Sequence, residues 1–227
     1  TCEPDTNQQL LEVTVDGKSI GTPESYTYKN LTLNSRIVAT FTGAMLFLDV
    51  RRADWFYSDV RYVVEHGLFH GTTQELFSPN APMTRGMLVT VLYRLAGSPK
   101  SAADSGFADV AADKYYADAV SWAAENGIVS GVSDGCFAPD SQVTREQLAA
   151  ILYRYARDKR YDTGKTADLM GFADYGQISG YAAEALGWTN AEGLVSGRSK
   201  TALSPQGSAT RAEVAAILHR FAENVAK

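Results

Sequence analysis

Hydrophobic residues in the larger, C-terminal part of the chain recur at the spacing of amphipathic helices. One stripe follows Thr144, which together with Gln147 fits the capping box that opens a helix. A shorter apolar stripe precedes it and stops at Gly127, a residue suited to a helix C-terminus. The pattern thus predicts a helix, a loop and a second helix. The stripe of the second helix occurs three times, as Leu88, Val91, Leu92 and Leu95, as Leu148, Ile151, Leu152 and Tyr155, and as Val214, Ile217, Leu218 and Phe221.

The whole helix-loop-helix unit is repeated. Asp49, Asp109 and Asp174 open the copies, Arg85, Arg145 and Arg211 follow 36, 36 and 37 residues later, and Gly67, Gly127 and Gly193 each lie 18 residues before the arginine. Two short amphipathic helices cannot bury their apolar faces alone, so the copies must pack on one another. The pattern leaves open whether they close into a compact pseudo-threefold body or stack as an open solenoid.

Residues 1–42 follow a different pattern. The segments "LEVTVDGKSIG" and "SYTYKNLTLNSRIVATF" alternate apolar and polar residues and are separated by glycine and proline. This alternation predicts two to four β-strands, which would be marginally stable alone. We therefore expect a β-strand segment at 1–42 and repeats at 43–100, 101–164 and 165–227, in a mainly α-helical fold.

Composition and charge limit the kinds of partner that the chain is expected to bind. The net charge is −5 and no run of Lys or Arg exceeds two residues, so nucleic acid is not an expected partner. We expect no membrane span, because no window holds about 20 apolar residues. The segment "TCEPDTNQQ" has neither the basic nor the apolar region of an export signal, and the chain looks cut from something longer.

The sequence contains no motif that indicates catalysis or a cofactor. The only histidines, His66, His70 and His219, do not recur at equivalent positions, and no HExxH, GxSxG or phosphate-binding loop is present. The stretch "SDGCFAPDSQVTRE" lacks the D-x-D-x-D-G order of a calcium loop. We therefore expect no enzyme, cofactor or metal site. Cys2 and Cys136 are interpreted as unpaired, with a disulfide between them as the alternative.

The arginines are the candidates for binding. Arg85, Arg145 and Arg211 each occupy the first position of a helix, where a positive charge costs about 0.3–1 kcal/mol if exposed. One interpretation is a salt bridge to an aspartate of a neighbouring copy. The other is an anion site, in which free backbone N–H groups of the helix N-terminus and the guanidinium share a carboxylate or phosphate. The repeated aspartates Asp49, Asp109 and Asp174 are expected to cap or brace the first helix, and they are also kept among the candidate ligand-binding residues.

Aromatic residues favour an acidic sugar over a bare anion. Trp122 and Trp188 occupy the same position, five residues before the glycine that ends the first helix, and Tyr62 takes it in the first copy. Core packing is the alternative for each of them. A flat ring beside an arginine is nevertheless suited to hold a sugar by one face and its carboxylate by the guanidinium.

These residues resemble S-layer homology domains. The resemblance rests on "F-x-D-V", the first-helix aromatic, "G-[LI]-[FV]-x-G", "F-x-P" and "T-R-A-E", in order, three times over residues 44–224. Only the third copy has T-R-A-E intact, since the second reads T-R-E-Q and the first T-R-G-M. Residues 1–42 more loosely resemble the tail of a β-repeat module of bacterial surface proteins.

The resemblance implies a trimer-like body at the bacterial cell surface, outside the cell, monomeric as a fragment. Its grooves would bind a secondary cell wall polysaccharide attached to peptidoglycan and ending in pyruvylated N-acetylmannosamine. The arginines would meet the pyruvyl carboxylate. Tyr62, Trp122 and Trp188, and the backbone around Gly71, Gly131 and Gly197, would line the sugar.

Two other functions stay open at this point. One is a protein–protein module for S-layer self-assembly, and the other is a hydrolase with its catalytic domain upstream. Gly86 and Met87 depart from the family pattern in the first copy. Met87 breaks the capping box and Gly86 weakens the helix, so we expect the loosest helix start there and the mildest effect from Arg85→Ala.

Overall fold

The computed structural model describes residues 10–23, 25–27, 35–41, 47–101, 104–133 and 135–226. Two compact units divide the chain: unit 1 is Thr1–Arg51 with Gly71–Phe77, and unit 2 is Arg52–His70 with Ser78–Lys227. Cys2 lies outside the described residues, so the question of its pairing with Cys136 stays open.

Unit 1 contains a small antiparallel sheet of order β2-β1-β3. Strand β1 (Leu10–Val15) pairs with β2 (Lys18–Ser19) and with β3 (Ile37–Phe41). Asp16 and Gly17 join the first two strands, both with positive φ (52° and 80°), as a two-residue hairpin requires. The expected β-strands are thus confirmed for the described residues. The likeness to a β-repeat module remains a prediction.

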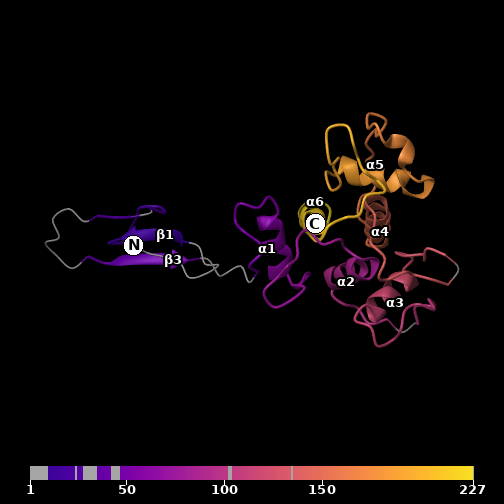
Figure 1. Cartoon of the computed structure of the whole chain (residues 1–227), viewed down its shortest axis with the longest axis horizontal. Coiled ribbons are helices and arrows are strands. Elements are labelled where there is room, and N and C mark those ends of the chain that lie inside the picture. The colour runs from indigo at the N-terminus through magenta and orange to yellow at the C-terminus, as the bar shows by residue number, and fades with distance from the viewer. Residues whose placement is uncertain are drawn as a thin grey trace. The chain divides into compact units, whose positions relative to one another are not determined.

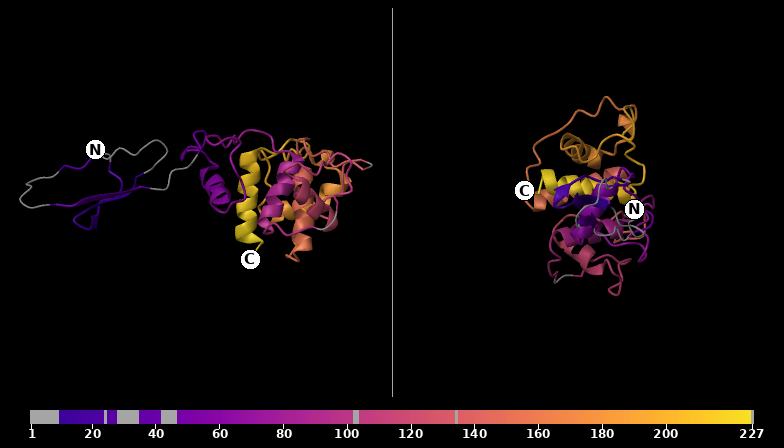
Figure 2. Two further views of the ribbon diagram at one scale, coloured as in Figure 1. Left: turned by 90° about the horizontal axis from the view of Figure 1, so that it is seen from below. Right: turned by 90° about the vertical axis from the view of Figure 1, so that its left-hand side faces the viewer.

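The described residues of unit 2 form six α-helices, two for each sequence repeat. The shorter helices are α1 (Tyr57–Glu65), α3 (Ala117–Glu125) and α5 (Ala183–Ala191). The others are α2 (Arg85–Leu95), α4 (Arg145–Asp158) and α6 (Arg211–Asn224), and the short 3₁₀ turns η1 (Tyr175–Gln177) and η2 (Gly180–Ala182) precede α5. Within this unit α2, α4 and α6 lie side by side in the middle (Figures 1 and 2).

Helix packing links each repeat to the one before it. Helix α3 packs on α2 and α5 packs on α4, while α1 of the first repeat packs on α6 of the third (Figure 1). At this last contact the rings of Tyr62 and His219 stack with centroids 4.0 Å apart, and His219 Nδ1 lies 2.8 Å from Asp59 Oδ1. The three helix pairs therefore form a closed ring.

Backbone hydrogen bonds close the same ring just before α2, α4 and α6, which are called the inner helices below. The amide of Met83 donates to Ala209 O (2.8 Å), that of Ala209 to Val143 O (3.0 Å), and that of Val143 to Met83 O (2.9 Å). All three residues are fully buried. Each repeat thus bonds to both others, which confirms the compact pseudo-threefold arrangement and excludes the open solenoid.

The inner helices begin where the sequence predicts. Thr144 and Thr210 each form a complete capping box, with Gln147 and Glu213 as the reciprocal partners. Thr84 accepts a hydrogen bond from Met87 N at 3.2 Å, the same distance as in the other two copies, without the reciprocal bond. The weaker helix start of the first copy remains a prediction.

Candidate ligand-binding grooves

The three repeated arginines are buried and reach into the loop of the following repeat. Arg85 Nε donates to Phe137 O (2.8 Å) and Arg145 Nε donates to Leu203 O (3.1 Å). Arg145 Nη2 also donates to Ser196 O, and Arg211 Nη2 donates to His70 O (2.7 Å). Each arginine is about 5% exposed. The guanidinium groups therefore fix loops of the neighbouring copy.

The amide groups at the helix N-termini are already occupied, contrary to our expectation of a backbone anion site. Arg85 N donates to Ser141 O (3.0 Å) and Gly86 N donates to Pro139 O (2.8 Å), both from the next repeat. The other two helices repeat this arrangement, with Arg145 N to Gly207 O, Glu146 N to Pro205 O, Arg211 N to Ala81 O and Ala212 N to Pro79 O. An external anion would have to meet the side chains instead.

The repeated aspartates brace loops rather than first helices. Asp109 accepts from the amides of Phe137 and Ala138 (2.8 and 2.7 Å), and Asp174 accepts in the same way from residues 203 and 204. Asp49 accepts from Phe77 N at 2.8 Å. None of the first helices has a side-chain cap. The expectation that these aspartates cap the first helix is therefore wrong. Their carboxylates instead accept hydrogen bonds from the loop that precedes the inner helix and contains Pro79, Pro139 or Pro205.

The two tryptophans are core residues. Trp122 and Trp188 are 3% and 1% exposed, and both pack against tyrosines of inner helices. Tyr62 lies between the rings of His66 and His219. None of the three lines either groove described below. The burial of Trp122 and Trp188 favours the core-packing interpretation for these two residues. A sugar contact at Tyr62, which is only partly buried, remains a prediction.

The repeated glycines permit close packing inside their own loops. A Cβ on Gly131 would lie 2.6 Å from Cys136 O, and one on Gly197 would lie 2.5 Å from Ser199 O. Gly71 is confined in the same way by Thr73 O and the ring of Phe47. Gly131 and Gly197 nevertheless line grooves with their backbone, whereas Gly71 belongs to unit 1.

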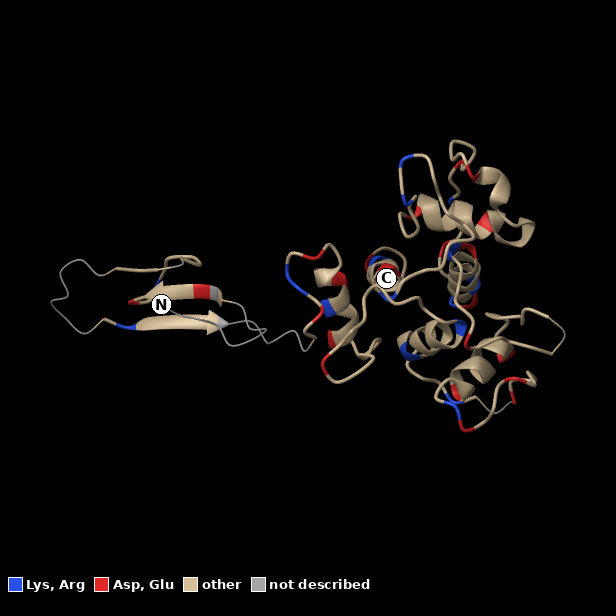
Figure 3. Ribbon diagram, viewed as in Figure 1, with Lys and Arg blue, Asp and Glu red and all other residues tan. Residues whose placement is uncertain are grey.

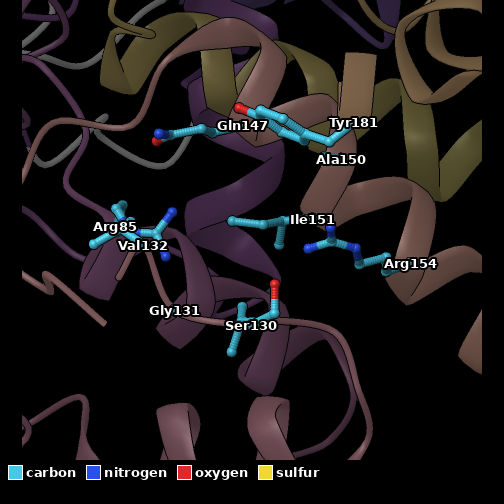
Figure 4. Close-up of a pocket in the computed structure, with 10 residues that line it drawn as sticks. Arg85, Ser130, Gly131, Val132, Gln147, Ala150, Ile151, Arg154 and Tyr181 are labelled. Atoms are coloured by element: carbon cyan, nitrogen blue, oxygen red, sulfur yellow. The ribbon is translucent and has the colours of Figure 1, made fainter. Parts of the chain in front are cut away.

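The first groove, here called the Arg85 groove, has a volume of about 340 Å³, within the range of small-ligand sites. Arg85 of α2 and Arg154 of α4 face each other across it, with Tyr181 and Gln147 along one edge and Ser130 on the opposite side (Figure 4). Its lining contains no carboxylate: Arg85, Val129, Ser130, Gly131, Val132, Gln147, Ala150, Ile151, Arg154 and Tyr181.

Both arginines of this groove have donors to spare. Beyond the bond from Nε to Phe137 O, the Nη groups of Arg85 have no hydrogen-bond partner among the described residues. Arg154 forms no hydrogen bond or ion pair with any residue that the structure describes. Burial lowers the pKa of Arg85, which nonetheless stays protonated at any physiological pH. The groove thus presents two guanidinium groups that form no direct ion pair with any residue that the structure describes.

Tyr181 is held at the edge of the groove by a buried carboxylate. Glu146, 2% exposed, accepts from Tyr181 Oη (3.0 Å) and from both the amide and the hydroxyl of Ser179 (3.0 and 2.8 Å). Tyr181 as a whole remains 54% exposed. Burial and the contact with Glu146 raise the pKa of this phenol to about 12. A fixed, exposed ring beside two guanidinium groups can stack on a sugar face.

A second groove, the Arg145 groove, has equivalent walls but different charges. Its volume is about 230 Å³, and its lining includes Arg145, Arg198, Arg220, Glu213 and, in place of a tyrosine, Trp55. Arg198 binds the Glu213 carboxylate through Nε (3.1 Å) and Nη2 (3.0 Å). Arg145 Nη1 lies 3.6 Å from the same carboxylate. This groove therefore carries its own anion.

Sequence reasoning missed the second arginine of each groove. Arg94, Arg154 and Arg220 each follow a repeated arginine by nine residues, a regularity visible in the sequence. In the first copy Arg94 Nη1 donates to Leu68 O (3.0 Å), whereas Arg154 has no such bond. The exposed aromatic, represented by Trp55, Tyr115 and Tyr181, lies two residues before the first helix of each copy.

Basic and acidic residues both occur on the helices of unit 2 (Figure 3), although α2 has only basic charged residues and α3 and α5 have only acidic ones. Among the described residues no helix is long and apolar enough to cross a membrane. No group of three metal-ligating side chains occurs in that part of the chain either.

Comparison with known families identifies these repeats. The model of the S-layer homology domain matches residues 46–86, 106–149 and 171–215. The chain belongs to the S-layer homology domain family. Its domains are non-catalytic anchoring modules, and the chain is accordingly a module of the bacterial cell surface.

The relatives of this S-layer homology module are large surface proteins and enzymes. The chain is 32% identical to the Surface-layer 125 kDa protein of Lysinibacillus sphaericus over 73% of its length and 14% of that protein. It is 29% identical to an amylopullulanase of Thermoanaerobacterium thermosulfurigenes (82% of the chain, 10% of the enzyme) and 27% identical to a cellulosome-anchoring protein of Acetivibrio thermocellus (70% and 36%). The chain thus spans a small part of these proteins.

Proposed function

We propose that this S-layer homology module anchors its parent protein by binding an acidic wall polysaccharide, with a ligand carboxylate in the Arg85 groove. The observation that carries this proposal is the pair of facing guanidinium groups, from Arg85 and Arg154, which form no direct ion pair with any described residue. A carboxylate between them would receive charge-assisted hydrogen bonds from both sides. Tyr181 would cover one face of the sugar that bears it.

The proposed polymer is a secondary cell wall polysaccharide ending in pyruvylated N-acetylmannosamine, as the family resemblance implies. A pyruvyl ketal carries its carboxylate close to the sugar ring, which suits a groove of about 340 Å³ with an aromatic edge. Arg85 then has two tasks, because Nε holds the loop of the second repeat while its Nη groups meet the ligand.

The test is titration calorimetry with isolated wall polysaccharide before and after mild acid removal of the ketals. The depyruvylated polymer should bind at least about tenfold more weakly, roughly 1.4 kcal/mol. Arg154→Ala should cause a similar loss with unchanged thermal stability, since Arg154 bonds to no described residue. Arg157→Ala, on the same helix but outside the groove, is the matched control.

Equal affinity for both polymers would refute the carboxylate site. Full binding by Arg154→Ala would refute the groove assignment. If the module instead associates with copies of itself or with other surface proteins and ignores the polymer, the self-assembly function takes precedence.

A further inference from the structure

The hydroxyl group of Tyr181 has a fixed hydrogen-bond direction. A carboxylate can only accept, so the 3.0 Å contact between Tyr181 Oη and Glu146 requires the phenol to donate. Burial and this contact raise the pKa of Tyr181 to about 12, and the phenol therefore keeps its proton at physiological pH. Because a phenol has a single O–H, its oxygen has only lone pairs left to offer.

The neighbouring hydrogen bonds agree with this direction. Gln206 Nε2 lies 3.1 Å from Gln177 O, a carbonyl that can only accept, so this end of the amide is its NH₂ group. The same nitrogen donates to Ser179 Oγ (3.3 Å), and the Ser179 hydroxyl in turn donates to Glu146 (2.8 Å). The Ser179 amide donates to the other carboxylate oxygen (3.0 Å). Glu146 thus accepts from three groups and donates to none of them.

Glu146 replaces the small residue found at this position in the other two repeats. The equivalent residues, second in their inner helices, are Gly86 and Ala212. A Cβ on Gly86 would lie 3.0 Å from the ring of Tyr116, whereas the residue that corresponds to Tyr116 in the third repeat is the small Ala182. Since α4 packs on η2 there, the glutamate takes the space that a ring fills in the other case. The glutamate and the small Ala182 therefore form a matched exchange between successive repeats.

Three of the four other polar side chains in the groove lining offer donors. The Nη groups of Arg85 and the guanidinium of Arg154 form no hydrogen bond with any described residue. Gln147 Oε1 accepts from the Thr144 amide (3.4 Å) in the capping box, so its NH₂ group is the end left for a ligand. Tyr181 Oη is therefore an acceptor among donors, and it suits a ligand O–H or N–H.

We propose that Glu146 is a specificity-determining residue of the Arg85 groove: it takes the only proton of the Tyr181 hydroxyl, so that the groove selects a ligand with a hydroxyl or amide N–H in addition to its carboxylate. A ligand that presents an ether oxygen or a second carboxylate at this edge would meet lone pairs and bind more weakly. Glu146 acts through Tyr181 and does not itself contact the ligand. This inference rests on the proposed function, in which Arg85 and Arg154 hold the carboxylate.

The test is calorimetry with the methyl glycoside of pyruvylated N-acetylmannosamine and two analogues. One analogue has hydrogen in place of the free ring hydroxyl, and the other has a methyl group in place of the acetamido hydrogen. One of the two should bind the unchanged chain about two- to threefold more weakly than the parent sugar, the loss expected for one hydrogen bond. Tyr181→Phe should bind the parent sugar with a similar loss and should no longer distinguish it from that analogue. Tyr175→Phe, outside the groove, is the control and should keep the preference.

Glu146→Gln should reverse the hydrogen bond to the phenol. Its amide oxygen can accept from Ser179 N while its NH₂ group donates to Tyr181 Oη, which frees the phenol proton for the groove. This variant should bind the parent sugar about two- to threefold more weakly and should bind the analogue that lacks the donor at least as well as the parent. A merely structural role of Glu146 would instead lower the affinity for all three sugars by one factor. Thermal unfolding checks that the variant is folded, and Tyr181→Phe tests the same bond if it is not.

Two outcomes would overturn the inference: an unchanged chain that binds both analogues as tightly as the parent sugar, or a Tyr181→Phe variant that keeps the preference. Binding that still depends on the ketal carboxylate would then leave the proposed function intact. A preference for the donor that disappears in Tyr181→Phe, together with equal affinity for the sugar with and without its ketal, would support the inference and refute the carboxylate site. If the unchanged chain binds none of these sugars, both proposals are wrong.

Discussion

Asp109 and Arg85 hold the two sides of one residue, Phe137. Asp109 Oδ1 accepts from the amide of Phe137 and Arg85 Nε donates to its carbonyl, both at 2.8 Å. The guanidinium carbon also lies 4.6 Å from the centre of the Phe137 ring. Asp109 and Arg85 come from successive repeats, and both bind the backbone of Phe137. They stabilise each other's position through the loop between them.

The same support recurs one repeat later, with Leu203 between Asp174 and Arg145 at 2.9 and 3.1 Å. In each case the supported loop stands beside a groove that the arginine lines. The repeated aspartates and arginines therefore have one structural task in common, and the arginines add a second task at the groove.

We expect Asp109→Asn to destabilise the fold by about 1 kcal/mol. The amide can accept from Phe137 N, but its NH₂ group cannot accept from Ala138 N, so one charge-assisted bond is lost. Urea unfolding followed by circular dichroism measures the effect. The control is Asp104→Asn, at an exposed position, and equal stability of the two variants would contradict the supporting role.

Acid should weaken the fold through the same carboxylates. Backbone hydrogen bonds hold the pKa of Asp174 below its usual value of 3.8, and for Asp109 such bonds outweigh the opposing effect of burial. A lowered folded-state pKa stabilises the protein above the unfolded-state pKa, and this contribution disappears as the pH falls through the folded-state value.

The double variant Asp109→Asn, Asp174→Asn should therefore lose less stability than the unchanged chain between about pH 5 and pH 2.5. Unfolding midpoints measured across this range test the difference in slope. Parallel pH profiles would show that other groups dominate acid unfolding.

The repeat pattern allowed the two helices of each repeat and the threonine caps of α2, α4 and α6 to be predicted, because these depend on local chemistry. Thr144 and its reciprocal partner, or a glycine at positive φ such as Gly127, act over a few residues. The hydrogen bonds among residues 83, 143 and 209 join segments that are distant in sequence, so periodicity alone left ring and solenoid equally possible.

The groove was harder to predict for the same reason. Its walls come from α2, the loop at 129–132, α4 and the segment before α5, in three different repeats. Trp122 and Trp188 recur regularly because each fills an equivalent core position, and recurrence cannot distinguish a core ring from a binding ring. The exposed Tyr181 lies outside the helical stripe, where pattern analysis gives it no weight.

Gly86 is a packing residue, and Gly86→Ala should destabilise the fold by about 1 kcal/mol although alanine favours helices. A Cβ there would lie 3.0 Å from the ring of Tyr116 and 3.1 Å from Pro139 O, both in the next repeat. Ala212→Gly, the reverse change at the equivalent position, should cost a similar amount through helix propensity alone. Thermal unfolding of both variants tests this, and a more stable Gly86→Ala would contradict it.

Among the repeated arginines, substitution of Arg85 should weaken polymer binding more than substitution of Arg145. The capping argument from the sequence predicts the opposite, with the mildest effect at Arg85. Arg85 lines the groove without a direct ion pair to any described residue, so Arg85→Lys should weaken polymer binding by about tenfold, because lysine cannot donate to Phe137 O and to a carboxylate in one planar fork. Arg145→Lys should change binding little, since Glu213 lies in that groove. Calorimetry at one salt concentration compares them. A stronger loss in Arg145→Lys would show that the Arg145 groove is the principal site.

Tyr181 should contribute through its ring, and Glu146 through the position of that ring. Tyr181→Ala removes the exposed edge of the Arg85 groove and should weaken binding about three- to tenfold, within the range of one aromatic contact. Tyr181→Phe keeps the ring but loses the 3.0 Å bond to Glu146, so its effect should be smaller. Tyr175→Ala, at an exposed tyrosine outside the groove, is the control. If Tyr181→Ala binds as well as Tyr175→Ala, no sugar stacks on this ring, and the two arginines alone must hold the ligand.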